Sequence, residues 1–192
     1  VDSETEARIS HALDELMKLG LMEIVAPELV PMVGSTQGDY HHRDVWSHSL
    51  HVMRNVGVGD ESLTLAALLH DVGKPPTRQF DDEGNIRFFG HESVGAEMAQ
   101  TILRRLKIPQ REIDTVVRLV RNHMRLGSAP VFTASAARRL IRDLDEDVER
   151  LVRLVEADAS SLRPGVRVMD LDPIRARIAE VAEDTPRERL ES

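Results

Sequence analysis

The sequence predicts an all-α fold, a helical bundle with one small β-hairpin inserted near residues 79–89. Most apolar residues recur three or four positions apart, which is the spacing of one face of an α-helix. Glycine and proline fall between these periodic stretches, where they end or separate helices. Hydrophobic residues make up 41% and charged residues 30% of the 192 residues, which is typical of a globular protein.

The first 70 residues are predicted to form three helices. Apolar spacing gives the first over residues 9–24, with Gly20 as the point where it can be interrupted. The stretch PELVPMVGSTQGDY, residues 27–40, is rich in proline and glycine and predicts a loop. A second helix is expected over residues 44–56, and a third from residue 60 or 61 to His70.

The remaining elements follow from the same signals. Residues 73–90, GKPPTRQFDDEGNIRFFG, are predicted to be non-helical, and their DDEGN turn indicates a hairpin. Beyond the helix that is expected from Asp170, the end EDTPRERLES is expected to fray. The four helices between them are predicted over residues 91–106, 109–123, 134–143 and 145–162.

The length suggests one domain with appended segments. We expect an N-terminal helical segment, residues 1–38, that packs on a central helical domain, residues 39–165, followed by a C-terminal helix and tail, residues 166–192. The first residue is Val1 rather than methionine, which suggests a processed chain or a piece of a longer protein.

Composition excludes several classes of protein. The chain has no cysteine, so disulfides, zinc–thiolate sites and cysteine nucleophiles are excluded, and a reducing cytoplasm fits. We find no signal peptide and no apolar run long enough to span a bilayer, so no membrane role is expected. The formal net charge of −8 argues against nonspecific coating of nucleic acid, although a local basic patch is compatible with it.

Ionisable side chains fall on the apolar sides of several predicted helices. His48 lies three positions after Val45 and four before Val52, so it points inward with them. The adjacent pair His70 and Asp71 ends the most apolar helix, which has no inexpensive way to finish on two ionisable groups. Comparable positions on later helices are occupied by His91, His123 and Asp158.

A divalent cation would satisfy several of these groups together. Mixed imidazole and carboxylate ligands favour manganese, iron, cobalt, nickel or zinc, with magnesium as an alternative. Each residue alone also has a simpler explanation. A buried histidine can be hydrogen-bonded in a core, Asp71 can form a turn, and Asp158 can pair with an arginine. The spacing therefore leaves metal binding and ordinary core packing both open.

The order His48, His70-Asp71, Asp158 resembles the H…HD…D signature of the HD superfamily of metal-dependent phosphohydrolases. LLHDVGKP, residues 68–75, is similar to the most recognisable stretch of that family. The resemblance implies an HD-domain helical bundle over residues 39–165, with these four side chains as metal ligands. Some members add two histidines and bind a second ion; His91 and His123 match them, and Asp71 would then bridge the two ions.

A closer resemblance runs from about residue 12 to residue 163. GLMEIVAPELVPMVG, YHHRDVWSHSLHVM, AALLHDVGKPPTR and FFGHESVGAEMA are similar to the C-terminal HD region of bacterial CCA-adding tRNA nucleotidyltransferases and poly(A) polymerase relatives. The catalytic head of that family, with its glycine-rich turn and paired carboxylates, has no counterpart here, so nucleotide addition is not expected of this chain. The chain is then either a stand-alone HD protein or a fragment of a longer enzyme.

The resemblance implies a phosphohydrolase that uses one or two divalent ions to activate water against a phosphomonoester or phosphodiester, with nucleotide-like substrates expected. Asp71 and Lys74 are the expected catalytic residues, and Lys74, Arg78 and His42 the expected substrate contacts. Lys74 can equally be a solvated loop lysine, and His42 can belong to a polar cluster that only solvates a loop.

The main alternative is a non-catalytic module that binds tRNA or another RNA, or a fragment of a tRNA nucleotidyltransferase. Its arginines at 104, 111, 118 and 125 repeat every seven residues, so some of them share a helix face that could contact an RNA backbone. A solvated face balanced by acidic residues is the other interpretation. A scaffold that uses its buried histidines only for packing is a third possibility, and the oligomeric state is not indicated.

Overall fold

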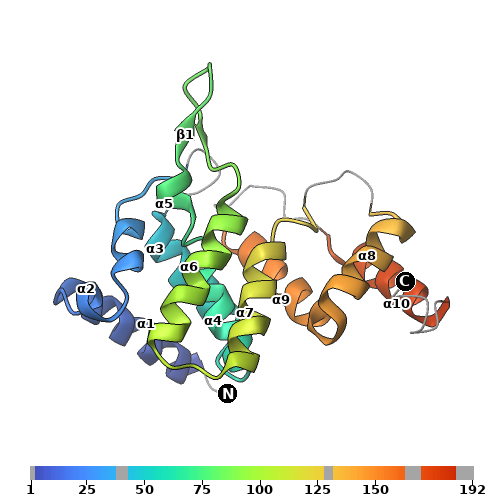
Figure 1. Ribbon diagram of the computed structural model, residues 1–192, viewed down its shortest axis with the longest axis horizontal. Helices are drawn as coiled ribbons and strands as arrows, with labels where there is room; N and C mark the ends of the chain where they lie inside the picture. Colours follow the sequence, from blue (N-terminus) through green and yellow to red (C-terminus); the bar gives the residue numbers. More distant parts are fainter. Residues whose placement is uncertain (1–2, 38–42, 128–131, 163–169, 185–192) are drawn as a thin grey trace.

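Helices build almost all of the regular structure of this chain, as Figure 1 shows, and the predicted all-α fold is confirmed. The computed structural model describes residues 3–37, 43–127, 132–162 and 170–184, and the statements below concern these residues. None of their helices has both the length and the apolar character that crossing a membrane requires. The elements in chain order are α1 (Ser3–Lys18), α2 (Met22–Val25), the 3-10 helix η1 (Pro27–Met32), α3 (Val45–Val56), α4 (Glu61–Leu69), α5 (Lys74–Thr77), β1 (Gln79–Phe80), β2 (Ile86–Arg87), α6 (His91–Arg105), α7 (Gln110–Asn122), α8 (Ala134–Leu144), the 3-10 helix η2 (Asp145–Asp147), α9 (Val148–Ser160) and α10 (Asp172–Asp184).

Helix α4 lies at the centre of the bundle because it is apolar on nearly every side. Most of its residues are buried, among them Leu63, Ala66 and Leu69. A helix of this kind must be covered all round, and α3, α7 and α9 pack against it. Helix α6 packs along α7, α1 lies on α3, and α8 pairs with α10 beside this centre. The C-terminal end of α4 therefore lies in the interior of the bundle, and so do His70 and Asp71, which follow it.

Two aspartates start the helices that surround the interior. The Asp44 carboxylate accepts the backbone N–H of Ser47 at 2.8 Å and that of Gly34 at 2.7 Å, so it caps α3 and also fixes the preceding loop. The Asp60 carboxylate accepts the backbone N–H of Leu63 at 3.1 Å and caps α4. Both caps agree with the predicted starts of these helices.

An ion-pair network ties three helices together beneath the core. The fully buried Asp147 receives Arg118 Nε of α7 at 3.0 Å and Arg150 Nη1 of α9 at 2.8 Å. Arg150 Nε also reaches the Asp60 carboxylate, at the start of α4, at 2.8 Å. A buried carboxylate needs such compensation, and here two guanidinium groups supply it.

The same network bears on the arginines that repeat every seven residues. Besides Arg118 with Asp147, Arg111 pairs with Glu146 at 3.5 Å and Arg125 with Asp143 at 2.9 Å. These three guanidinium groups are balanced by carboxylates from η2 and from the end of α8. This agrees with the interpretation of a solvated, charge-balanced face rather than an RNA-binding stripe.

The structure corrects two predicted loops. Residues 27–32, within the predicted loop 27–40, form η1, because Pro27 suits a first helical turn and a 3-10 turn brings Leu29 and Met32 to the same buried side. Residues 74–77 form the one-turn helix α5, although they were expected to be non-helical. Its two prolines stand in the first turn, where no N–H is needed, and Thr77 Oγ1 donates to Gly73 O at 2.8 Å.

Other boundaries lie close to their predictions. Gly20, with a φ of 72°, separates α1 from α2 at the expected interruption. The hairpin is confirmed, with Gln79 opposite Arg87 and Phe80 opposite Ile86. The helix predicted over 145–162 begins with η2 and becomes α-helical at Val148. The tail helix is confirmed as α10, residues 185–192 lie outside the described residues, and the division at 38 and 165 stays a prediction.

A close approach of backbones positions the segment after Asp71. Gly73 lies against the start of α6, so that a Cβ on it would overlap the carbonyl oxygen of His91 and lie 2.6 Å from the Gly95 nitrogen. The φ of Gly73 is −78°, which any residue adopts, so glycine is required here by space and not by conformation. This contact sets the distance between Asp71 and His91.

We therefore expect Gly73→Ala to destabilise the fold more than Gly84→Ala, measured as the free energy of unfolding in urea. At Gly84 a side chain meets no neighbour but forces a φ of 81°, which costs about 1–2 kcal/mol. At Gly73 the new methyl group must displace the backbone of α6, so the loss should exceed that of the control variant. Equal losses, or a stable Gly73→Ala protein, would contradict the close approach.

Candidate metal centre

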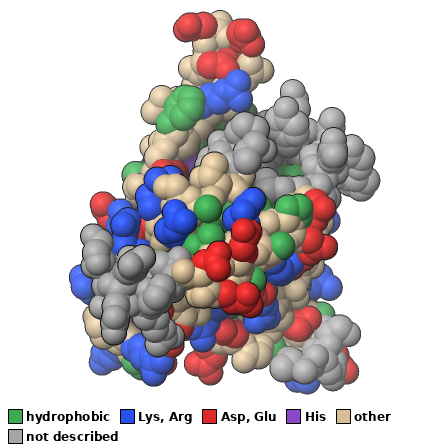
Figure 2. All heavy atoms as spheres, turned by 90° about the vertical axis from the view of Figure 1, so that its right-hand side faces the viewer, with side chains coloured by type: hydrophobic (Ala, Val, Ile, Leu, Met, Phe, Trp, Pro, Cys, Tyr) green, Lys and Arg blue, Asp and Glu red, His purple; other side chains and the backbone are tan. Residues whose placement is uncertain are grey.

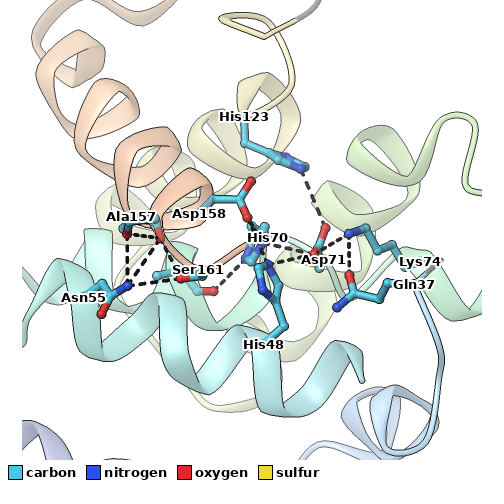
Figure 3. A network of polar contacts seen from close by, with 12 residues as sticks. Gln37, His48, Asn55, His70, Asp71, Lys74, His123, Ala157, Asp158 and Ser161 are labelled. Carbon is cyan, nitrogen blue, oxygen red and sulfur yellow. Dashed lines mark hydrogen bonds and ion pairs between the residues drawn. The ribbon is translucent and has the colours of Figure 1, made fainter. Parts of the chain in front are cut away.

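Six ionisable side chains from five helices converge in the interior, as Figure 3 shows for most of them. Helices α3, α7 and α9 pack against α4, and α6 packs along α7, so the bundle itself brings the six together. Five of the six are 5% exposed or less, while the Asp158 side chain is 31% exposed. The six are His48 of α3, His70 and Asp71 after α4, His91 at the start of α6, His123 after α7, and Asp158 of α9.

The first group comprises the four residues of the predicted signature. His48 Nε2 lies 2.9 Å from Asp158 Oδ1 and 3.6 Å from Asp71 Oδ2. His70 Nε2 lies 3.1 Å from Asp71 Oδ2 and 3.9 Å from Asp158 Oδ1. The structure thus brings all four within reach of one another, although they are spread over 110 residues of sequence.

The second group meets the other oxygen of Asp71. His91 Nε2 lies 3.5 Å and His123 Nε2 3.8 Å from Asp71 Oδ1, and the two nitrogens are 3.2 Å apart. Three residues of the first group, His48, His70 and Asp71, have ligand atoms within 4.8 Å of one another, which is compact enough for a metal site. The same is true of Asp71, His91 and His123. Asp71 belongs to both, through a different oxygen in each.

Three of the histidines are oriented in the same way. In His70, His91 and His123, Nδ1 contacts a backbone carbonyl three residues earlier in the chain, which can only accept a hydrogen bond. Nδ1 must therefore carry the proton, and in the neutral ring Nε2 presents its lone pair to the interior. The carbonyls are Ala67 O at 2.8 Å, Phe88 O at 2.8 Å and Val120 O at 2.7 Å.

This orientation brings imidazole lone pairs together in the interior. Two lone-pair nitrogens, His91 Nε2 and His123 Nε2, face each other at 3.2 Å, which is unfavourable without a proton or cation beside them. Among the described residues, His70 Nε2 and Asp71 Oδ2 are buried without a hydrogen bond of good geometry. Buried polar atoms without a hydrogen bond are rare, and a divalent cation would satisfy both of these. The residues present therefore fit a metal ion.

The pKa values of the buried imidazoles are shifted in different directions. Burial lowers the pKa of His123 to about 4, and burial also lowers that of His91, so both rings are neutral near pH 7 and available as ligands. Burial alone would lower the pKa of His70, but the adjacent Asp71 carboxylate outweighs it and raises that pKa.

The carboxyl groups stay ionised. Burial alone would raise the pKa of Asp71, but the charges of His70 and Lys74 hold it well below its ordinary value. The pKa of Asp158 is also lowered, because the hydrogen bond from His48 outweighs the effect of burial. Two buried or half-buried carboxylates in one place supply the negative charge that a cation site needs.

Lys74 is held inside the centre rather than in solvent. Its side chain is buried, with Nζ 2.7 Å from Asp71 Oδ2 and 2.6 Å from Gln37 Oε1, so the alternative of a solvated loop lysine is wrong. Sequence reasoning missed Gln37, because a lone amide in a glycine-rich loop carries no periodic signal. Arg78 is exposed and donates to Thr36 Oγ1 at 3.0 Å, outside the cluster. His42 lies outside the described residues.

Comparison with known proteins agrees with this geometry. The family model described as HD domain matches residues 38–183. The CC-adding tRNA nucleotidyltransferase of Thermus thermophilus is 39% identical over 162 residues, which cover 81% of this chain and 36% of that protein. The A-adding tRNA nucleotidyltransferase of Deinococcus radiodurans is 39% identical over 153 residues, covering 77% and 35%. The multifunctional CCA protein of Cupriavidus necator is 30% identical over 156 residues, covering 79% and 37%. The chain thus spans about a third of the length of these curated relatives.

The lowered pKa of His123 predicts how stability depends on pH after metal has been removed with a chelator. The unfolded chain takes up a proton near the ordinary histidine pKa of about 6.5, whereas folded His123 resists it down to about 4. Stability should therefore fall as pH drops from about 6.5 to 4, by about 3 kcal/mol from this one residue. His123→Gln should flatten the profile of unfolding free energy against pH. A His123 ring that titrates near 6.5 by NMR would contradict the assignment.

Proposed function

The chain belongs to the HD domain family, and we propose that it is a metal-dependent phosphohydrolase acting on a phosphomonoester or phosphodiester of nucleotide-like character. The observation that carries the proposal is the buried Asp71, whose two oxygens face two separate groups of imidazole nitrogens. Such a carboxylate is arranged as a bridging ligand, because each of its oxygens lies beside a different set of imidazole nitrogens that can bind a metal.

The ligands follow from that arrangement. His48, His70, Asp71 and Asp158 would hold one ion, and Asp71, His91 and His123 a second. Two imidazole nitrogens at each ion position favour manganese, iron, cobalt, nickel or zinc over magnesium. A bound ion of this kind lowers the pKa of a coordinated water and polarises a phosphoryl oxygen. The half-exposed Asp158 marks the side from which a substrate and water would enter.

The remaining residues orient and balance this centre. The three backbone carbonyls fix the rings of His70, His91 and His123, so that Nε2 is the ligating atom in each. Lys74 places an ammonium group beside Asp71, where we propose that it contacts phosphate oxygens. Gln37 holds that ammonium in position. Arg78 and His42 remain proposed substrate contacts.

A second candidate function rests on the named relatives. Because they are tRNA nucleotidyltransferases, this chain could serve as a tRNA-contacting part whose metal site is only structural. The ion-paired arginines described above give little support to a basic RNA-binding stripe. The two functions differ in their dependence on metal, since RNA binding through phosphates weakens with salt and survives chelation.

We expect Asp71→Asn and His70→Ala to lose both bound metal and phosphate-ester hydrolysis. Metal would be measured by elemental analysis, and turnover on a generic phosphomonoester and a cyclic phosphodiester. Asp71→Asn keeps the side-chain shape but removes the charge that both ion positions share. Activity should therefore fall at least about a hundredfold, as expected for loss of metal catalysis. His11→Ala, on the exposed side of α1, is the matched control and should retain both.

Two results separate the candidates. Unchanged turnover in Asp71→Asn would reject the hydrolase assignment. A metal-loaded wild-type protein that is inert on a broad panel of phosphate esters, yet retains tRNA after chelation, would favour the RNA-binding function instead. Circular dichroism of each variant would show whether a lost activity reflects a lost fold.

A further inference from the structure

The β1–β2 hairpin grows directly out of the candidate metal centre. Its first strand follows α5, which begins with Lys74, and its second strand leads into α6, which begins with His91. Figure 1 shows the hairpin projecting beyond the helices, with α5 at its base. A ligand that extended out of the centre on this side would therefore lie along the hairpin.

Aromatic residues are concentrated on this projection. The chain has four phenylalanines, and three of them, Phe80, Phe88 and Phe89, lie in or beside the hairpin. Phe80 is 66% and Phe89 71% exposed. Exposed apolar side chains are ordinary when scattered, but a cluster beside a candidate site indicates a binding surface.

One face of the hairpin alternates positive charge with aromatic rings. Phe80 and Ile86 are opposite each other and therefore on the same face of the hairpin. Continuing the register one residue beyond the pair of Gln79 and Arg87 brings Arg78 opposite Phe88 on that face. The Arg78 guanidinium lies over the Phe80 ring, 5.4 Å from its centre. The Lys74 ammonium lies 5.6 Å from the centre of the Phe88 ring.

Two contacts and the strand register place these residues in one row that starts at the proposed bridging ligand. Lys74 Nζ is 2.7 Å from Asp71 Oδ2 and contacts Phe88, and Arg78 contacts Phe80. The register sets Arg78 opposite Phe88, so the row runs outward from Asp71 through Lys74, Phe88, Arg78 and Phe80. We call this row the hairpin track. Basic groups that follow a phosphate backbone, together with aromatic rings on which bases stack, are how proteins bind single-stranded nucleic acid.

We propose that the hairpin track binds the bases and phosphates next to the reacting phosphate, so that the substrate is the end of a single-stranded oligonucleotide rather than a base-free phosphate ester. This inference rests on the proposed function, whose substrate class it narrows. Phe88 is positioned for the base nearest the centre and Phe80 for the following one, while Lys74 and Arg78 meet the phosphates between them.

The charge along the hairpin limits how far an anionic ligand can extend. Beyond Phe80, the turn carries Asp81, Asp82 and Glu83, and Figure 2 shows acidic side chains at the tip of the projection with apolar and basic ones below. Asp81 is neutralised by Arg87 at 2.8 Å, whereas Asp82 and Glu83 are exposed and would repel phosphates. The track therefore ends at the acidic tip, which limits how far a bound strand can follow the hairpin.

The test compares two substrates on metal-loaded protein. One is a trinucleotide RNA with a terminal phosphate, and the other is glycerol phosphate, which has no base. Phe80→Ala should lower kcat/KM for the trinucleotide about tenfold or more, as expected for loss of one stacked base, and leave glycerol phosphate within about twofold. Phe80→Trp should restore the trinucleotide value. Leu19→Ala, at an equally exposed apolar residue after α1, is the control and should change neither.

A binding measurement keeps the inference separate from the proposed hydrolysis. The affinity of the chelator-treated protein for the same labelled trinucleotide, measured by fluorescence anisotropy, should fall by a similar factor in Phe80→Ala. If neither the wild type nor any variant turns over a substrate, while Phe80→Ala still weakens trinucleotide binding, the hydrolase proposal is rejected and the track is kept. The track would be overturned if Phe80→Ala lowered turnover of both substrates equally, or if it left trinucleotide binding unchanged. Binding of the exposed rings to a protein but not to the trinucleotide would also overturn it.

Discussion

The structure depends on one unfavourable group, the carboxylate of Asp71 in the interior of the bundle. It is 1% exposed, and a charge in that position must be compensated by its surroundings. Four imidazoles and one ammonium lie within 3.8 Å of its two oxygens. Every helix that packs around α4 contributes to this compensation or positions a residue that does. The most apolar helix packs at the centre of the fold, and this packing also places the Asp71 carboxylate there.

Helix ends do most of the positioning. His70, His91 and His123 stand at a helix start or just past a helix end, where a carbonyl three residues back is within reach of Nδ1. A ring held in this way cannot rotate to offer Nδ1 to the interior, so the ligating atom is decided by the backbone. The contact of Gly73 with α6 adds the last constraint, since it fixes the separation of the two halves of the centre. In a bundle, residues distant in sequence are brought to one point by such endings rather than by a single loop.

Much of the centre could be predicted from sequence because its residues occupy periodic positions. His48 follows the apolar face of its helix, and Asp158 continues the face of another, so both had to point inward. The helical turns of residues 27–32 and 74–77 were missed, because prolines that usually end a helix can also stand in its first turn. Gln37, the carbonyl anchors and the particular carboxylate that pairs with each arginine were also beyond sequence reasoning. They depend on the distance between separate elements, which local pattern does not contain.

We propose that two cations share Asp71. The most direct measurement is anomalous diffraction from crystals of the protein loaded with manganese or zinc. The account predicts one peak bonded to His48, His70, Asp71 and Asp158, and a second to Asp71, His91 and His123, each at about 2.1 Å from the ligand atoms. Electron density with no anomalous peak at this place, and with the imidazoles hydrogen-bonded to protein groups in a closed interior, would contradict it.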